Sequence, residues 1–257
     1  MILMTAILTF ASVLNFGQIT SGKTLFGETL TYESKLSKII RGIPVADLRF
    51  SVSKAAESEN YLIKTEAVSK GTLLKLFRFN FLQQYETLVD RDKFRVLKTT
   101  KRDVQKDRVR DSVADFDYRD NRVRYTESDP QNPNRPPRRI ASLIGPNVQD
   151  LVSGIFAIRF MPLSVGKMFE VTISDSGLVY VIPVSVTARE RIKSIYGKVW
   201  CYRVEPLIFG KGRLIEQKGN MIIWYMDDAR RLPVRSRIDT EYGKVEVKLK
   251  TATPAAP

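Results

Sequence analysis

Histidine and cysteine are the scarcest chemistry-bearing residues of this chain: its 257 residues include no histidine and one cysteine. The absence of histidine excludes Ser-His-Asp and Cys-His catalytic groups and histidine-ligated zinc or iron sites. One cysteine excludes a disulfide framework, a CxxC redox pair and a thiolate zinc site. We therefore expect neither a metal nor a cofactor. We also predict that Cys201, in the segment VWCYRV, is a small apolar strand residue rather than a nucleophile.

Long apolar segments are also scarce, and the clearest one is too short for a stable transmembrane helix. It is MILMTAILTFASVLNF at residues 1–16, which carries no charged side chain and precedes small and polar residues. This pattern is typical of a secretory signal peptide, although the usual basic residue at its start is missing. We predict a signal peptide at residues 1–22, cleavage after Gly22, and no transmembrane span in the exported protein.

Residues 17–24, GQITSGKT, match the G-x-x-x-x-G-K-[ST] pattern of the phosphate-binding loop of nucleotide triphosphatases. That loop joins a strand to a helix whose N-terminal amide groups face the phosphates. Here the motif runs into LFGETLTYESKL, where Leu30, Tyr32 and Leu36 alternate with polar residues as in a strand. The predicted cleavage would also divide the motif, so we interpret it as a chance match.

Positive charge exceeds negative charge, with 42 Lys and Arg against 28 Asp and Glu and a net charge of +14. This bias favours acidic partners such as nucleic acid, anionic lipid, phosphorylated glycan or an acidic protein. Residues 91–139 carry both signs at strand spacing, which indicates solvated faces with cross-strand ion pairs rather than a nucleic-acid-binding stripe. We expect no nucleic-acid partner. Arg138 and Arg139 are our candidates for contacting anionic lipid or glycan phosphate.

Apolar and polar residues alternate through most of the chain from residue 28 to residue 250, which is the pattern of half-buried strands. The clearest examples are residues 46–52, 77–81, 114–125 and 245–249. Residues 114–125 predict a hairpin with its apolar residues on one face. Residues 179–186 are nearly all apolar and predict a strand buried on both faces. Many antiparallel strands joined by short polar turns predict an all-β sandwich or barrel.

One segment has helical rather than strand spacing, and we predict that Asn147 caps this helix and Pro162 limits it. Its apolar face is formed by Val148, Leu151, Val152, Ile155 and Ile158. We therefore expect one helix packed against the sheet.

A segment rich in proline and asparagine, DPQNPNRPPRR, occupies residues 129–139 and is either a domain linker or a long loop. We favour the loop, because the strands predicted on either side have the same character. The domain organisation that follows is a single β-rich domain at residues 23–250 and a disordered tail, TATPAAP, at residues 251–257.

The aromatic residues of the predicted strands have two interpretations. They are core residues, or they line a concave face that binds acyl chains or sugars if the barrel is open. The candidates are Phe77, Phe79, Phe81, Trp200, Tyr202 and Trp224.

The sequence Asp227-Asp228 lies next to Arg230-Arg231 and also has two interpretations. Two carboxylates near arginines would suit general acid–base chemistry if they converged. Neighbouring strand residues point to opposite faces, however, so a hairpin turn with surface ion pairs is the alternative that we favour.

Four stretches, in this order and spacing, resemble the bacterial domain-of-unknown-function family 3108 over roughly residues 25–250. They are GETLTYESKL (27–36), IPVADLRFSV (43–52), LVSGIFAIRFMPLSVGK (151–167) and IIWYMDDARRLPVR (222–235). The resemblance implies an exported, mainly antiparallel envelope protein and assigns no activity. It also implies a fold similar to the half-open barrels of periplasmic lipoprotein carriers, which is an analogy of fold alone.

These observations lead to three functional hypotheses. The first is a non-enzymatic periplasmic or otherwise exported protein that binds an amphiphilic lipid or a glycan in a concave, aromatic-lined face of an open or flattened barrel. The second is a structural or assembly protein that binds another envelope protein. The third is a carboxylate-dependent hydrolase built on Asp227 and Asp228. A deep apolar cavity would favour the first hypothesis, and a solid core with an exposed apolar patch the second.

Overall fold

The computed structural model describes residues 24–37, 42–72, 75, 78–241 and 243–254. The predicted signal peptide and Phe77 lie outside these residues. The strands are β1 (Thr29–Ser37), β2 (Ile43–Lys54), β3 (Tyr61–Ser69), β4 (Phe81–Val89), β5 (Val96–Gln105), β6 (Arg108–Asp117), β7 (Arg122–Ser128), β8 (Arg138–Leu143), β9 (Val148–Gln149), β10 (Met168–Asp175), β11 (Leu178–Ser194), β12 (Gly197–Pro206), β13 (Gly219–Met226), β14 (Pro233–Thr240) and β15 (Gly243–Thr253).

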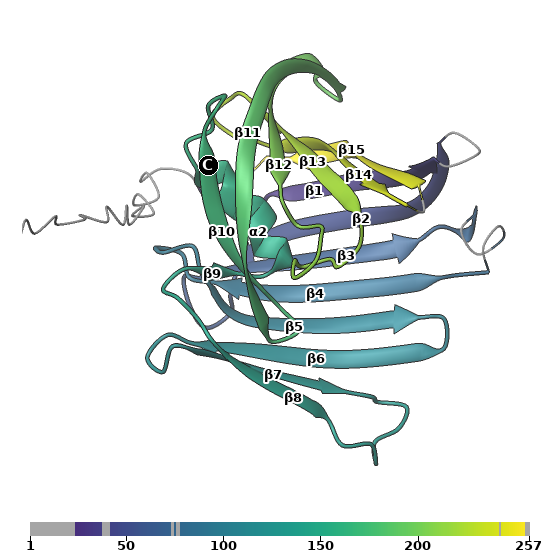
Figure 1. The fold of residues 1–257 in the computed structure, drawn as a ribbon, viewed down its shortest axis with the longest axis vertical. Helices are drawn as coiled ribbons and strands as arrows, with labels where there is room; N and C mark the ends of the chain where they lie inside the picture. Colours follow the sequence, from purple (N-terminus) through teal and green to yellow (C-terminus); the bar gives the residue numbers. More distant parts are fainter. Residues whose placement is uncertain (1–23, 38–41, 73–74, 76–77, 242, 255–257) are drawn as a thin grey trace, which may run out of the picture.

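The strands form one sheet in the order β8-β7-β6-β5-β4-β3-β2-β1-β15-β14-β13-β12-β11-β10-β9. Every pairing is antiparallel except that of β9 with β10. The first and last strands pair in the middle of the sheet, where Thr29 lies opposite Thr253. The sheet is open, since β8 and β9 are its two edges, and its two halves curve toward each other around a short helix (Figure 1). The predicted all-β, open-barrel architecture with a packed helix is confirmed.

The helix, α2 (Leu151–Ala157), lies between the two halves of the sheet and contacts β3, β4, β9 and β10 (Figure 1). A short 3-10 helix, Ile158–Phe160, follows it. The predicted start was wrong: Asp150, not Asn147, is the N-cap. Its carboxylate accepts from the Ser153 amide at 2.7 Å, and the Ser153 hydroxyl accepts from the Asp150 amide at 3.0 Å. Val148 belongs to β9 rather than to the helix, because it pairs with β10.

The predicted hairpin at residues 114–125 is confirmed as β6 and β7, with Phe116 and Val123 buried opposite each other. The strand predicted over residues 77–81 begins only at Phe81. Residues 179–186 fall within β11, but only one face is buried: Ile182 is 2% exposed and Val181 is 52% exposed. The apolar run there reflects an exposed apolar face, not a doubly covered strand.

The proline-rich segment connects β7 to β8, two neighbouring strands of the sheet, so it is a loop within the sheet and not a linker between domains. It is shorter than predicted, since Arg138 and Arg139 already belong to β8. The predicted disordered tail is wrong at residues 251–253, because β15 continues to Thr253 and pairs there with β1; residues 255–257 lie outside the described residues.

The outer face, turned away from α2, carries the predicted cross-strand ion pairs. Arg102 of β5 contacts Asp111 of β6 at 3.1 Å, within the predicted range of residues 91–139. Outside that range, Lys64 of β3 contacts Glu86 of β4 at 2.7 Å in the same way. A shallow polar groove of about 640 Å³ runs across β2–β7 between these rows. Its charges of both signs largely neutralise one another, which is the solvated face that the sequence predicts.

Candidate functional site

An apolar cavity of about 150 Å³ lies between α2 and the inner face of the sheet. The residues that line it come from β1, β2, α2, the 3-10 helix and β13–β15: Leu30, Tyr32, Leu48, Phe50, Ile155, Phe156, Arg159, Met221, Ile223, Pro233, Arg235, Ser236, Ile238 and Val247. A dry apolar cavity of this size holds a benzene-sized group. The cavity is therefore large enough for a short apolar portion of a ligand.

Two polar groups in the cavity wall, those of Tyr32 and Arg159, are bound to partners in the protein, whereas the buried Nε of Arg235 has none among the described residues. The Tyr32 hydroxyl donates to the Pro233 carbonyl at 2.9 Å, and burial raises the pKa of Tyr32, which keeps this donor protonated. Arg159 is turned toward Glu28. The cavity thus offers a ligand apolar contact and few free hydrogen-bonding groups.

Exposure of the wall residues shows which end of the cavity is closed and which is open. Leu30, Phe50 and Phe156 are at most 8% exposed and form the closed end. Met221, Ile238 and Val247 are only partly buried and form the mouth. Met221 lies directly opposite Ile238, near the end of their two strands. The mouth therefore faces the end of the sheet at which β13 begins and β14 finishes.

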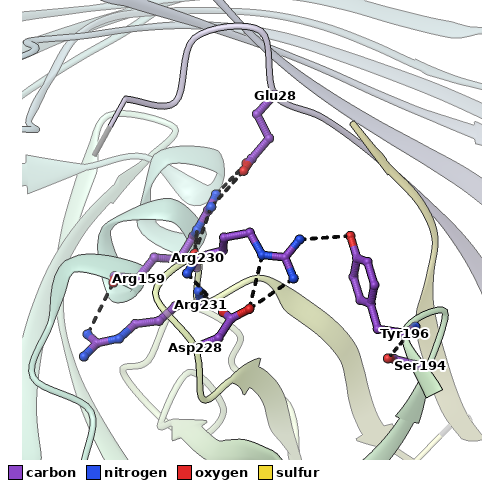
Figure 2. Close-up of polar contacts among 7 residues, drawn as sticks. All are labelled: Glu28, Arg159, Ser194, Tyr196, Asp228, Arg230 and Arg231. Atoms are coloured by element: carbon purple, nitrogen blue, oxygen red, sulfur yellow. Dashed lines mark hydrogen bonds and ion pairs between the residues drawn. The ribbon is translucent and has the colours of Figure 1, made fainter. Parts of the chain in front are cut away.

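A buried ion pair adjoins the cavity through Arg159, which belongs to its wall. Figure 2 shows this pair and its neighbours. Arg159 donates to the two carboxylate oxygens of Glu28 at 2.6 and 2.8 Å, and both side chains are about 5% exposed or less. The Arg159 guanidinium also donates to the carbonyl of Arg230 at 3.1 and 3.2 Å. In return, Arg231 donates to carbonyl groups of Arg159 and Met161. This network fastens the 3-10 helix to the segment before β1 and to the turn before β14.

The two aspartates of the third hypothesis do not converge on a common point. Asp227 accepts from Arg189 at 2.6 Å. Asp228 instead accepts hydrogen bonds from the backbone amides of Arg230 and Arg231 and from the Arg230 guanidinium (Figure 2). The same guanidinium donates to the Tyr196 hydroxyl at 3.4 Å. These are the turn and ion-pair roles that we favoured from the sequence.

The remaining residues singled out from the sequence lie away from the cavity. Phe79 and Phe81 contact each other at the start of β4 with ring centroids 6.2 Å apart. Trp200 is 46% exposed on β12 and stacks with Arg189. Trp224 is buried and donates to Glu190 at 2.5 Å. Arg138 and Arg139 are exposed on the edge strand β8.

None of these predicted residues lines the cavity, so the residues that form its wall were not predicted from the sequence. The available signal was the alternation of Leu30 and Tyr32 in β1 together with Ile155 on the predicted helix. Which strands meet that helix depends on the sheet order, which alternation does not give. The described residues also contain no group of three or more acidic or cysteine side chains placed to hold a metal ion.

Cys201 is buried in β12, and burial raises its pKa to about 12. The thiolate is the reactive form, so its population at pH 8 is very small in the folded protein. We expect no labelling of native protein by Ellman's reagent at pH 8 within minutes, and one thiol per chain in denaturant. Rapid labelling of the native protein would contradict the buried position.

The geometry defines an open, β-barrel-like antiparallel protein with a helix and an apolar cavity inside the curve of the sheet. The chain belongs to the family described as "Protein of unknown function (DUF3108)", which it matches over residues 29–250. A comparison with curated proteins finds no match. Within the described ranges, no helix has the length and apolar character needed to span a membrane.

Among solved structures, the chain is similar to a β-barrel-like protein of domain of unknown function DUF1849 from Brucella abortus. The two share 12% sequence identity with a TM-score of 0.59, and the match covers 91% of this chain and 99% of that one. At this identity the similarity concerns the fold alone.

Proposed function

We propose that this protein is an exported envelope protein that binds an amphiphilic lipid without chemical conversion. A short apolar portion of the lipid occupies the cavity between α2 and the sheet. The observation that carries the proposal is the cavity itself, with a closed apolar end at Leu30 and Phe50 and an open end at Met221 and Ile238. A ligand with an apolar end and a polar end fits this gradient.

The apolar character of the cavity wall favours a lipid over a glycan as the ligand. A sugar presents hydroxyl groups in every direction, and each one buried without a partner carries a free-energy cost. The hydroxyl of Tyr32 and the guanidinium of Arg159 are already engaged inside the protein. An acyl group needs no such partners and gains about 0.8 kcal/mol for each buried methylene.

The substitution Val247→Phe tests the cavity directly, because Val247 lines it near the mouth. The larger ring displaces the equivalent of two or more ligand methylenes, which corresponds to about tenfold or more weaker binding. Titration with a fluorescent fatty acid measures the affinity. Val113→Phe is the matched control, since Val113 is also partly buried but borders the outer groove of the sheet.

We expect the Val113→Phe protein to bind the probe as the unsubstituted protein does. Equal loss in both variants, or loss in neither, would contradict binding in the cavity. Native mass spectrometry of protein purified from its own host then identifies the ligand, as additional mass that leaves on collisional activation.

The alternative function is assembly with another envelope protein, and a separate observation supports it. Met168 is 68% exposed and Val181 52% exposed, and both lie on the outer face of the β10–β11 pair, where Met168 is opposite Ser185 and Val181 is opposite Thr172. Exposed apolar side chains of this kind often mark protein contacts. If the native protein carries no lipid and co-purifies with a second protein in a Met168-dependent manner, assembly replaces lipid binding as the preferred function.

A further inference from the structure

At one end of the sheet, the loops and turns between strands are rich in lysine and arginine. Apart from the β10–β11 turn, which packs against β8 through a hydrogen bond from Ser142 to the Gly177 carbonyl, antiparallel register brings together the β1–β2, β3–β4, β5–β6, β7–β8, β12–β13 and β14–β15 connections at this end. We call these connections, with one strand residue on either side, the mouth rim, because the cavity opens toward them. In Figure 1 the connections between β1 and β8 that belong to the mouth rim lie along the right-hand side.

Basic residues clearly outnumber acidic residues in the described part of the mouth rim. The basic residues are Lys70, Lys75, Arg78, Lys106, Arg108, Arg135, Arg138, Lys211, Arg213 and Lys218. The acidic residues are Asp107, Asp129, Glu216 and Glu241. Arg139 and Lys244 lie one position further along their strands.

The opposite end of the sheet lacks this excess. Its β4–β5 turn places Asp90 and Asp92 among Arg91, Lys93 and Arg95. Its β6–β7 turn pairs Arg124 with Asp117 and Asp120. The positive field of the molecule is therefore directed toward the end at which the cavity opens.

Three exposed lysines lie in the mouth rim, in the chain segments that lead into the strands of the cavity mouth. Lys218 lies three residues before Met221, and Lys244 lies three residues before Val247; both Met221 and Val247 form the mouth. Lys211 belongs to the same β12–β13 connection as Lys218. Among the described residues none of the three has an ion-pair partner, in contrast to Lys70, which contacts Glu33 and Asp47 at 3.0 Å. Their charges are available to an external anion.

We propose that the mouth rim docks on the surface of an anionic lipid bilayer and holds the cavity mouth against the headgroups. This inference rests on the proposed lipid-binding function and adds where the ligand is exchanged. A bilayer fits better than a small acidic ligand, because the rim spreads its charges over the width of the sheet. From β1 to β8 alone this is roughly 34 Å at about 4.8 Å per strand. A planar anionic surface can meet several of these charges at once, and each one within a Debye length of the surface contributes.

The test is co-sedimentation with vesicles of phosphatidylglycerol and phosphatidylcholine, compared with vesicles of phosphatidylcholine alone. The rim variant carries Lys211→Gln, Lys218→Gln and Lys244→Gln. The control variant carries Lys93→Gln, Arg119→Gln and Arg122→Gln, three exposed residues of the opposite end without ion-pair partners among the described residues. Both variants lose three positive charges, so a difference in vesicle binding between them reflects where on the molecule the charges lie.

We expect binding to anionic vesicles that weakens with salt and is absent on neutral vesicles. Each basic residue near the surface corresponds to roughly a fivefold change in affinity, so the rim variant should bind on the order of 100-fold more weakly. The control variant should stay within a fewfold of the unsubstituted protein. Equal weakening of both variants would mean non-specific attraction and would overturn the proposal, as would no binding to anionic vesicles.

A fluorescent fatty acid in solution separates this proposal from the proposed function. The rim variant should still bind the probe, since its substitutions lie outside the cavity wall. Vesicle binding without probe binding would leave the docking surface standing and refute the lipid-binding cavity. Probe binding without rim-dependent vesicle binding would refute the docking surface alone.

Discussion

Replacing Glu28 with alanine is expected to lower the free energy of unfolding by about 3–5 kcal/mol, which is the usual effect of leaving a buried charge without its partner. Arg159 is 4% exposed, so its guanidinium cannot recover the lost interaction by contact with water. The carbonyl of Arg230 accepts from the same guanidinium but does not neutralise it. Urea unfolding followed by tryptophan fluorescence measures the difference.

Glu59→Ala is the matched control, because it removes a carboxylate that is 64% exposed and is paired with Lys54 and Arg91. An exposed pair of this kind contributes little to stability, because water screens it. The double variant Glu28→Leu with Arg159→Met removes both buried charges and should recover much of the loss. A Glu28→Ala protein no less stable than the Glu59→Ala protein would show that Arg159 is not held in a buried pair.

Asp150→Ala is expected to cost about 3 kcal/mol or more, because one carboxylate serves the helix and the sheet together. It caps α2 through the Ser153 amide, and it accepts the hydroxyl groups of Thr87 on β4 and Thr99 on β5 at 2.5 and 2.8 Å. Loss of a cap costs about 1 kcal/mol, and each buried hydroxyl left without a partner adds about 1–3 kcal/mol.

Asp150→Ser separates these two roles, since serine also caps helices but is too short to reach both threonines. We expect its stability to fall between that of the unsubstituted protein and that of Asp150→Ala. Thermal unfolding followed by circular dichroism measures the series. If Asp150→Ser is as stable as the unsubstituted protein, the threonine contacts contribute nothing and the carboxylate acts as a cap alone.

Local patterns in the sequence predicted the strands well and the helix start poorly, for a physical reason. The alternation over residues 114–125 reports one buried face, and burial follows directly from it. Both Asn147 and Asp150 are good capping residues, and the choice between them depends on β9, where Val148 and Gln149 pair with β10. That pairing joins residues 148–149 to residues 172–173, so no local sequence pattern predicts it.

The cavity lies beyond local prediction for the same reason. Leu30 and Ile223 contribute to one wall because β1 and β13 belong to one curved sheet wrapped around α2. The aromatic side chains that drew attention in the sequence have other roles: Trp224 is a core residue with a hydrogen bond to Glu190. The most buried ion pair, Glu28 with Arg159, joins two segments that have no pattern in common.

The pairing of β1 with β15 has a consequence for the order of events during folding. The central strand of the sheet needs Thr253 opposite Thr29, so it is incomplete until the last strand has been synthesised. Closing so long a segment of chain is slow, and until then β1 exposes an unpaired edge to other chains. The nascent chain therefore lacks its central pairing until β15 has been synthesised. Until then it depends on protection from aggregation.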